Sequence, residues 1–205
     1  MAIIKNGING GFSGKVGNVV GSTWRGLEII RSKPRPPQKF SEKQLANQLK
    51  MKLVQLFLKK MVEVVRIGFR DETIIPTAFN SALSYNKKNA ITGDYPDLLL
   101  DYSLVRLAQG EVYVPENLSL SQDDAGIHLE WDATIKENAR RDDQLLLVIW
   151  DEETSTCEYS LQAYRSNAKF SFLPQQLKAG MHIWAAFIRH DRSQQSNSVY
   201  LGVTV

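Results

Sequence analysis

The first 26 residues contain seven of the chain's 13 glycines, and glycine-rich loops are one means by which proteins hold phosphate groups. A phosphate loop has the pattern G-x-x-x-x-G-K-[ST], whose hydroxyl reaches a magnesium ion. Here Gly14-Lys15 is followed by Val16, which has no hydroxyl, and Asn9 occupies the position of the first glycine. A dinucleotide fingerprint also fails, because no two of these glycines are two residues apart. Segment 10–21 is therefore predicted to bind no nucleotide, and its glycines to allow turns and close backbone approach between short strands.

The histidines and the cysteine do not match catalytic or metal-binding spacings. His128 alternates with Ile127 and Leu129 in an expected strand and is predicted to face solvent, whereas His182 is predicted to be a core or edge histidine. No His or Lys adjoins Cys157 in sequence to lower its thiol pKa, so we expect a buried, unreactive thiol. The carboxylate clusters fall in predicted hairpin turns, where acidic residues are common. The sequence therefore predicts no catalytic residue, no metal site and no cofactor.

Basic residues are concentrated in the first third of the chain. Residues 1–70 hold 14 Lys and Arg against three acidic residues, whereas residues 71–205 hold 11 against 19. This asymmetry favours an acidic partner such as nucleic acid, or association of oppositely charged patches of two copies. The alternative is that the lysines only solvate a helix face and an arm. The candidate interaction surface comprises Lys15, Trp24, Arg25, Arg31, Lys33, Arg35, Lys39, Lys43, Lys50, Lys52 and Lys59.

An arm and two helices are expected to connect the first strands to the C-terminal half. Three prolines in segment 31–40 disfavour helix and predict an extended basic arm. Ser41 and Gln44 have the spacing of a capping box, which predicts a helix that begins there and runs to Gly68. Its second half is predicted to be buried, because apolar residues surround it. A second helix is expected over 76–91. The first helix should carry an apolar stripe formed by Leu45, Leu49, Leu53 and Leu56. Lys43, Lys50, Lys52 and Lys59 are expected to lie outside this stripe.

Beyond residue 112 the apolar period changes from 3.6 to 2, which predicts strands. Seven short strands separated by turns are typical of a β-sandwich of the immunoglobulin or fibronectin type III kind. The expected fold is therefore α+β, with a Gly-rich strand, linker and helix region at 1–112 and a seven-stranded sandwich at 113–205. The strands are expected at 117–121, 126–131, 144–151, 157–163, 168–173, 181–190 and 197–205. The sandwich core is expected to include Trp131, Val148, Phe170, Ile183 or Trp184, and Tyr200 or Leu201.

Cysteine content and hydropathy indicate where in the cell the protein is made and whether it enters a membrane. Cys157 is the only cysteine, so no intramolecular disulfide forms, which suits a reducing environment. The N-terminus lacks the basic-then-apolar pattern of a signal peptide. The longest strongly apolar run, residues 145–150, is far shorter than a membrane span. We expect no signal peptide, no transmembrane segment and no membrane partner, with synthesis in the cytoplasm.

Several blocks of the sequence resemble an uncharacterised bacterial family of about two hundred residues. They are "GKVGNVVGSTWRG", "SEKQLANQ", "SYNKKNAITGDYP" and "SNSVYLGVTV", of which the third is the most specific. The resemblance covers most of the chain and implies a C-terminal half like a β-sandwich, without an activity for particular residues. The Gly-rich opening also looks loosely like small structural proteins of virions or mobile elements.

These observations favour a non-catalytic structural or protein-interaction module, a subunit of a larger assembly, which binds a protein partner or another copy of itself. The alternative is a nucleic-acid-associated protein that uses the basic first third, although no helix-turn-helix, RNA-recognition or zinc-finger pattern accompanies the basic residues.

Overall fold

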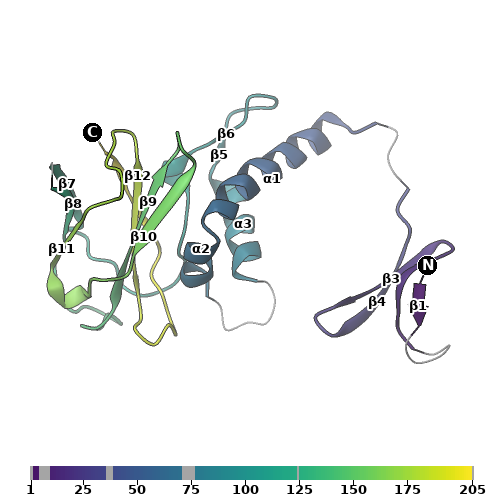
Figure 1. The fold of residues 1–205 in the computed structure, drawn as a ribbon, viewed down its shortest axis with the longest axis horizontal. Helices are drawn as coiled ribbons and strands as arrows, with labels where there is room; N and C mark the ends of the chain where they lie inside the picture. Colours follow the sequence, from purple (N-terminus) through teal and green to yellow (C-terminus); the bar gives the residue numbers. More distant parts are fainter. Residues whose placement is uncertain (1, 5–9, 36–38, 71–76, 124, 205) are drawn as a thin grey trace. The chain divides into compact units, whose positions relative to one another are not determined.

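A computed structural model describes residues 2–4, 10–35, 39–70, 77–123 and 125–204 (Figure 1). The chain divides into two compact units, Met1–Ser41 and Glu42–Val205. The first is called here the N-terminal unit and the second the body. This division differs from the predicted boundary at 112/113, because the helices that follow residue 41 share an apolar core with one of the sheets that follow residue 112.

The N-terminal unit is a single antiparallel sheet in the order β1-β2-β3-β4. Its strands are β1 (Ala2–Ile4), β2 (Phe12–Val16), β3 (Val19–Trp24) and β4 (Leu27–Ser32). Arg25 and Gly26 connect β3 to β4 and both have positive φ, which is the geometry of a tight hairpin turn. At Gly21 an added Cβ would lie 2.1 Å from the carbonyl oxygen of Phe12. The prediction that these glycines serve turns and close backbone approach is confirmed at Gly14, Gly17, Gly21 and Gly26.

Three helices open the body: α1 (Glu42–Lys60), α2 (Val62–Gly68) and α3 (Ala78–Asn89). The prediction of one continuous helix to Gly68 is wrong at a single residue, since Met61 departs from helical geometry with φ −118° and ψ 27°. The helix does end at Gly68, where a Cβ would lie 2.2 Å from the carbonyl oxygen of Leu107. The predicted second helix begins later than expected, because Thr77 caps it by accepting a hydrogen bond from the Asn80 amide at 3.3 Å.

The apolar stripe of α1 is shifted from its predicted position. Leu56 is exposed over 55% of its surface, and the buried side chains of α1 are Val54, Phe57 and Leu58. The second half of the helix is packed as predicted, because it lies against the sheet, whereas the first half carries no fully buried residue.

All seven strands predicted after residue 112 are present, in two antiparallel sheets. The smaller sheet has the order β11-β8-β7, and the larger sheet the order β10-β9-β12-β13. The smaller sheet consists of β7 (Ser119–Asp123), β8 (Gly126–Glu130) and β11 (Lys169–Phe172). The larger sheet consists of β9 (Gln144–Asp151), β10 (Thr156–Ser160), β12 (His182–Ile188) and β13 (Val199–Val203). A short pair, β5 (Ile91–Thr92) with β6 (Leu99–Leu100), links the helices to this region.

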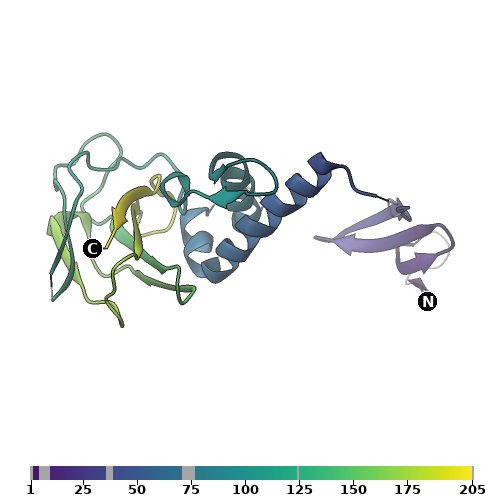
Figure 2. The same ribbon diagram turned by 90° about the horizontal axis from the view of Figure 1, so that it is seen from above.

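The larger sheet is covered on both faces. The smaller sheet lies against one face and the helices against the other (Figures 1 and 2). Along β9, Leu145, Leu147 and Ile149 belong to the core shared with the smaller sheet. The alternate residues Leu146, Val148 and Trp150 belong to the core shared with the helices. This two-sided burial explains why residues 145–150 are apolar without alternation.

The residues predicted for one sandwich core are divided between these two cores. Trp131 and Ile183 are buried between the sheets, with Phe170 and Leu201 partly buried beside them. Val148 and Trp184 are buried against the helices instead, with Tyr200 partly buried there.

Candidate functional site

Seven of the eleven candidate surface residues lie in the N-terminal unit, and all seven are exposed. Lys15 on β2 lies opposite Val20 on β3, which lies opposite Arg31 on β4. Because alternate residues of a strand share a face, Trp24 is on the same face as this row. The Arg25 guanidinium carbon lies 5.3 Å from the centre of the Trp24 ring. The sheet register therefore brings two cations and one aromatic side chain to a common face.

The other four candidates, Lys43, Lys50, Lys52 and Lys59, lie on α1 and do not form the single face that the sequence suggested. Lys50 follows Lys43 by seven residues and lies almost in line with it along the helix. Lys52 follows Lys43 by nine residues, which is two and a half turns, so it lies on the opposite side together with Lys59. The α1 lysines therefore form two separate pairs.

The N-terminal sheet exposes large apolar side chains. All six residues of β4 are exposed, with Leu27 at 60% and Ile30 at 61% of their surface. Trp24 and Val16 are exposed by 47% and 48%. Within residues 10–35 the only buried residue is Gly21, which has no side chain to pack. Since adjacent strand residues point to opposite faces, Ile29 and Ile30 place apolar surface on both faces of the sheet.

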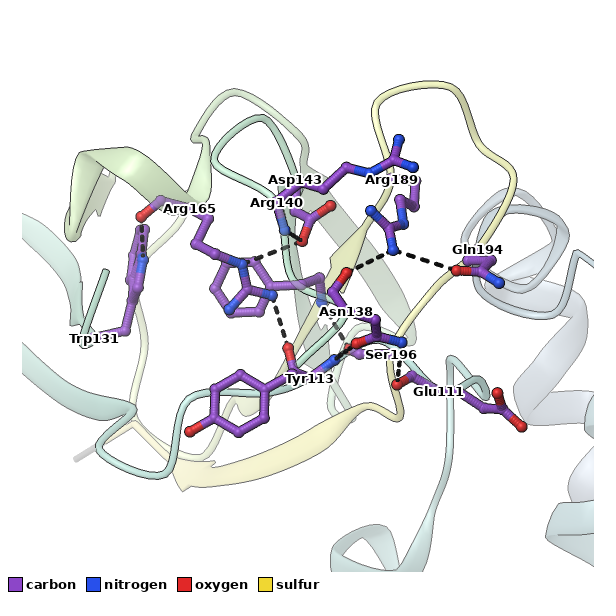
Figure 3. A network of polar contacts seen from close by, with 11 residues as sticks. Glu111, Tyr113, Trp131, Asn138, Arg140, Asp143, Arg165, Arg189, Gln194 and Ser196 are labelled. Atoms are coloured by element: carbon purple, nitrogen blue, oxygen red, sulfur yellow. Dashed lines mark hydrogen bonds and ion pairs between the residues drawn. The ribbon is translucent and has the colours of Figure 1, made fainter. Parts of the chain in front are cut away.

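A buried ion pair at the start of the larger sheet was not predicted from the sequence (Figure 3). Asp143 immediately precedes β9, and Arg165 begins the short 3-10 helix η3 (Arg165–Asn167). The Arg165 Nε atom donates to Asp143 Oδ2 at 3.2 Å, and neither side chain is exposed. Arg165 Nη2 also donates to the Tyr113 carbonyl oxygen at 2.7 Å, and the Arg140 amide donates to Asp143 Oδ2 at 2.8 Å.

Aromatic groups enclose this pair. Trp131 Nε1 donates to the Arg165 carbonyl oxygen at 2.8 Å, and the Arg165 guanidinium carbon lies 4.1 Å from the centre of the Phe187 ring. Burial lowers the pKa of Arg165, while the charge of Asp143 opposes that shift. Since both charged side chains are inaccessible, the pair serves to fix neighbouring loops and offers no surface to a ligand.

Asn138 extends the same network to the next loops. Its Oδ1 atom accepts from the Tyr113 amide at 3.0 Å, and its Nδ2 atom donates to the Glu111 carbonyl oxygen at 2.9 Å. Arg189 Nη2 donates to the Asn138 carbonyl oxygen at 2.5 Å and to Gln194 Oε1 at 3.4 Å (Figure 3). The network thereby joins the segment before β7 to the loops that precede β9 and follow β12.

His128, Ser171 and Asp123 form a hydrogen-bonded row on the outer face of the smaller sheet, the face on which the sequence predicted His128. His128 Nδ1 lies 2.8 Å from Ser171 Oγ, and His128 Nε2 lies 2.8 Å from Asp123 Oδ1. The hydrogen bond from His128 lowers the pKa of Asp123. A serine hydrolase triad has the serine at Nε2 and the carboxylate at Nδ1, the reverse of this order. The row joins β7, β8 and β11 across an exposed strand surface and has the geometry of a cross-strand contact.

His182 belongs to a partly buried aromatic cluster on the helix side of the larger sheet. Its ring centre lies 4.1 Å from that of Tyr102, and Nδ1 lies 2.8 Å from the Tyr200 hydroxyl. Burial lowers the pKa of His182, which the nearby Glu152 carboxylate opposes. Burial also raises the pKa of Tyr102 to about 12.

Cys157 packs partly buried against the same core, and burial raises the pKa of its thiol to about 12. A thiol with so high a pKa is a poor nucleophile at neutral pH. Among the residues that the structure describes, no three His, Cys, Asp or Glu side chains gather as metal ligands would. No helix in the described ranges has both the length and the apolar character to cross a membrane.

These features define an α+β protein with a body of helices and antiparallel sheets and a separate sheet that carries exposed apolar and basic side chains. Residues 11–202 match the model of a family of unknown function, DUF6266, and the chain belongs to that family. This agrees with the expectation of an uncharacterised domain of about two hundred residues. Searches of curated proteins and of solved structures found no match.

Proposed function

We propose that the protein is a non-catalytic structural subunit whose N-terminal sheet docks on a protein surface within a larger assembly. The observation that carries this proposal is the exposure of Trp24, Leu27 and Ile30 on a sheet that has no buried side chain within residues 10–35. Folded domains consist of at least two packed layers, because a sheet must bury its apolar face against another element. A second layer supplied by a partner satisfies this requirement.

The energetic argument favours a partner with apolar surface. Full burial of one Leu or Ile side chain is worth about 1.5–3 kcal/mol, and β4 offers Leu27, Ile29 and Ile30. A unit of about 40 residues rarely stabilises its own fold without such help. Burial of these side chains stabilises both the sheet and the complex.

A nucleic-acid partner is the alternative, supported by the exposed cations of the N-terminal unit. Single strands bind to such surfaces through stacking on aromatic rings and through phosphate contacts. Trp24 is the only exposed aromatic residue on β2, β3 and β4, and Arg25 already lies over its ring. Phosphates do not cover isoleucine and leucine side chains, so the apolar residues of β4 favour a protein.

The body is proposed to be a rigid scaffold of the fibronectin type III kind with an added helical layer. In constant-type immunoglobulin domains, strands A, B, E and D form one sheet and C, F and G the other. Suppose that β7, β8 and β9 correspond to strands A, B and C. The next strand, β10, then pairs with β9, which corresponds to C, whereas strand D of the constant type belongs to the sheet of A and B. The smaller sheet is therefore left with three strands. This strand order supports a fibronectin-like arrangement over a constant-type one.

Site-specific photo-crosslinking tests the proposed function. A photoreactive amino acid replaces Leu27 in the full chain, and a control chain carries it at Ser121 on the polar outer face of the smaller sheet. We expect protein adducts from the Leu27 position and none from the Ser121 position. Adducts with nucleic acid alone, or equal labelling from both positions, would contradict the proposal.

A further inference from the structure

Each sheet of the protein ends in strands that have one backbone edge open, and two of these edge strands are complementary in charge. In the N-terminal unit, β4 pairs only with β3, and in the body β10 pairs only with β9, within the residues that the structure describes. An open edge presents unpaired amide and carbonyl groups and accepts a further strand. Natural proteins use this geometry to bind extended segments of a partner.

The edge of β10 is acidic. Glu158 lies within the strand, and Glu152 and Glu153 lie in the turn before it, with 64% and 84% of their side chains exposed. The hydroxyl of the exposed Tyr159 donates to Glu63 Oε2 at 2.9 Å, which adds a carboxylate from α2. The nearby cation Lys178 contacts Asp151 and Glu153 at 3.5 and 3.8 Å.

The other edge strands of the body are less suited to a basic partner. β11 carries Lys169, and β13 has no charged residue between Val199 and Val203. β7 carries Asp123, which is already engaged with His128 at 2.8 Å. The β10 edge is therefore the one that gathers several carboxylates beside an exposed aromatic ring. Two of them also contact other residues: Glu158 accepts from the Gln175 amide at 3.1 Å, and Glu152 Oε2 lies 3.9 Å from His182 Nε2.

The edge of β4 has the complementary character. Arg31 lies within the strand and Lys33 follows it, and residues 1–41 hold seven Lys and Arg against the single acid Glu28. The strand also exposes Leu27, Ile29 and Ile30. Face-to-face pairing of two N-terminal sheets would bring like charges together, which is unfavourable.

We propose that β4 of one copy adds to the edge strand β10 of a second copy, and this inference rests on the proposed docking function. Backbone hydrogen bonds would align the two strands, Tyr159 would cover apolar side chains of β4, and Arg31 and Lys33 would face the β10 carboxylates. Each copy has one donor strand and one acceptor edge on different surfaces. Such a heterologous contact generates a ring or an open filament of copies.

Sedimentation velocity of the full chain tests this proposal across protein concentration at low and high salt. We expect association that grows with concentration and weakens with salt, since screening reduces the attraction between exposed charges. Two variants separate the sides of the contact: Arg31→Glu with Lys33→Glu, and Glu152→Lys with Glu153→Lys. Each variant alone should remain monomeric, and their equimolar mixture should associate.

A matched control and the crosslinking assay distinguish failure of the β4–β10 contact from failure of the proposed docking function. The double change Lys52→Glu with Lys59→Glu alters the charge by the same amount on α1 and should leave association intact. A wild-type protein that stays monomeric at submillimolar concentration and low salt, or a variant mixture that does not associate, overturns the β4–β10 contact. If Leu27 then crosslinks to a different protein, the proposed docking function stands; if it crosslinks to no protein, both fail.

Discussion

Arg165 and Asp143 form an ion pair in which neither side chain is exposed to solvent, with Nε 3.2 Å from Oδ2. The two residues lie 22 positions apart in the chain. Removing one partner of such a pair leaves a buried charge without compensation, which is more costly than the net contribution of the pair itself.

Replacement of Arg165 by Met should therefore lower the free energy of unfolding by about 3–5 kcal/mol. The double change Arg165→Met with Asp143→Leu should cost less than the sum of the two single changes, because it leaves no unpaired charge. Urea unfolding of the three variants measures these differences. Additive effects would contradict the assigned ion pair.

Trp131 should contribute both packing between the two sheets and a hydrogen bond to the stability of the body. Trp131→Ala is expected to cost about 3–5 kcal/mol, because the ring is buried between the sheets. Trp131→Phe keeps most of the ring volume but leaves the Arg165 carbonyl oxygen without its donor, and should cost about 1–3 kcal/mol. Equal losses for the two variants in urea unfolding would show that the ring volume is unimportant.

The stability of the body should fall in alkaline solution. The pKa values of Cys157 and Tyr102 are both raised to about 12, from 9.0 and 10.0. Between pH 9 and pH 12 the unfolded chain loses these protons first, so the folded state binds more protons and the free energy of unfolding decreases as pH rises. Cys157→Ala should make this decrease shallower. Unfolding curves measured across that range test the difference, and parallel curves would contradict it.

Nucleic-acid binding should be weak at physiological ionic strength. If the six described cations of the N-terminal unit did contact phosphates, the logarithm of affinity would fall with the logarithm of salt with a slope of about −5 on duplex DNA. Fluorescence anisotropy with a labelled duplex measures this slope. Submicromolar affinity that disappears when Lys15, Arg31, Lys33 and Lys39 are changed to Glu would favour the nucleic-acid alternative.

A fragment of residues 113–205 should not fold as a stable sandwich. Without the helices, it exposes Val148, Trp150 and Trp184, which are buried against α1 and α2 in the body. A fragment of residues 42–205 retains that cover and should give a cooperative thermal transition. Circular dichroism of the two fragments makes the comparison, and a cooperative transition of the shorter one would show that the two cores are independent.

The local pattern predicted the elements of this protein better than their contacts. Apolar alternation, short apolar runs and turn residues located the seven strands of the body, and the glycines located the turns of the N-terminal sheet. The break at Met61 had no local signal, because a Met within an apolar helix is compatible with helical geometry. The apolar run 145–150 contained evidence for burial on both faces, although it was assigned to a single core.

In the candidate site, too, the contacts between distant residues could not be predicted from local patterns. Arg165 meets Tyr113 and Asp143 from 52 and 22 positions away, so no spacing within the sequence indicates that they are neighbours. The division of the α1 lysines into two sides, by contrast, follows from their spacing alone. Exposure of β4 could not be predicted, because its apolar residues are those of an ordinary buried strand.

The two-sided cover of the larger sheet also has a consequence for synthesis on the ribosome. The three helices span residues 42–89 and leave the ribosome before β9 begins at Gln144. The run 145–150 therefore emerges next to a layer that is already made and that will cover one of its faces. Six consecutive apolar residues of this kind are prone to pair with other chains while they are exposed. The order of the chain shortens that exposure and protects the nascent protein from aggregation.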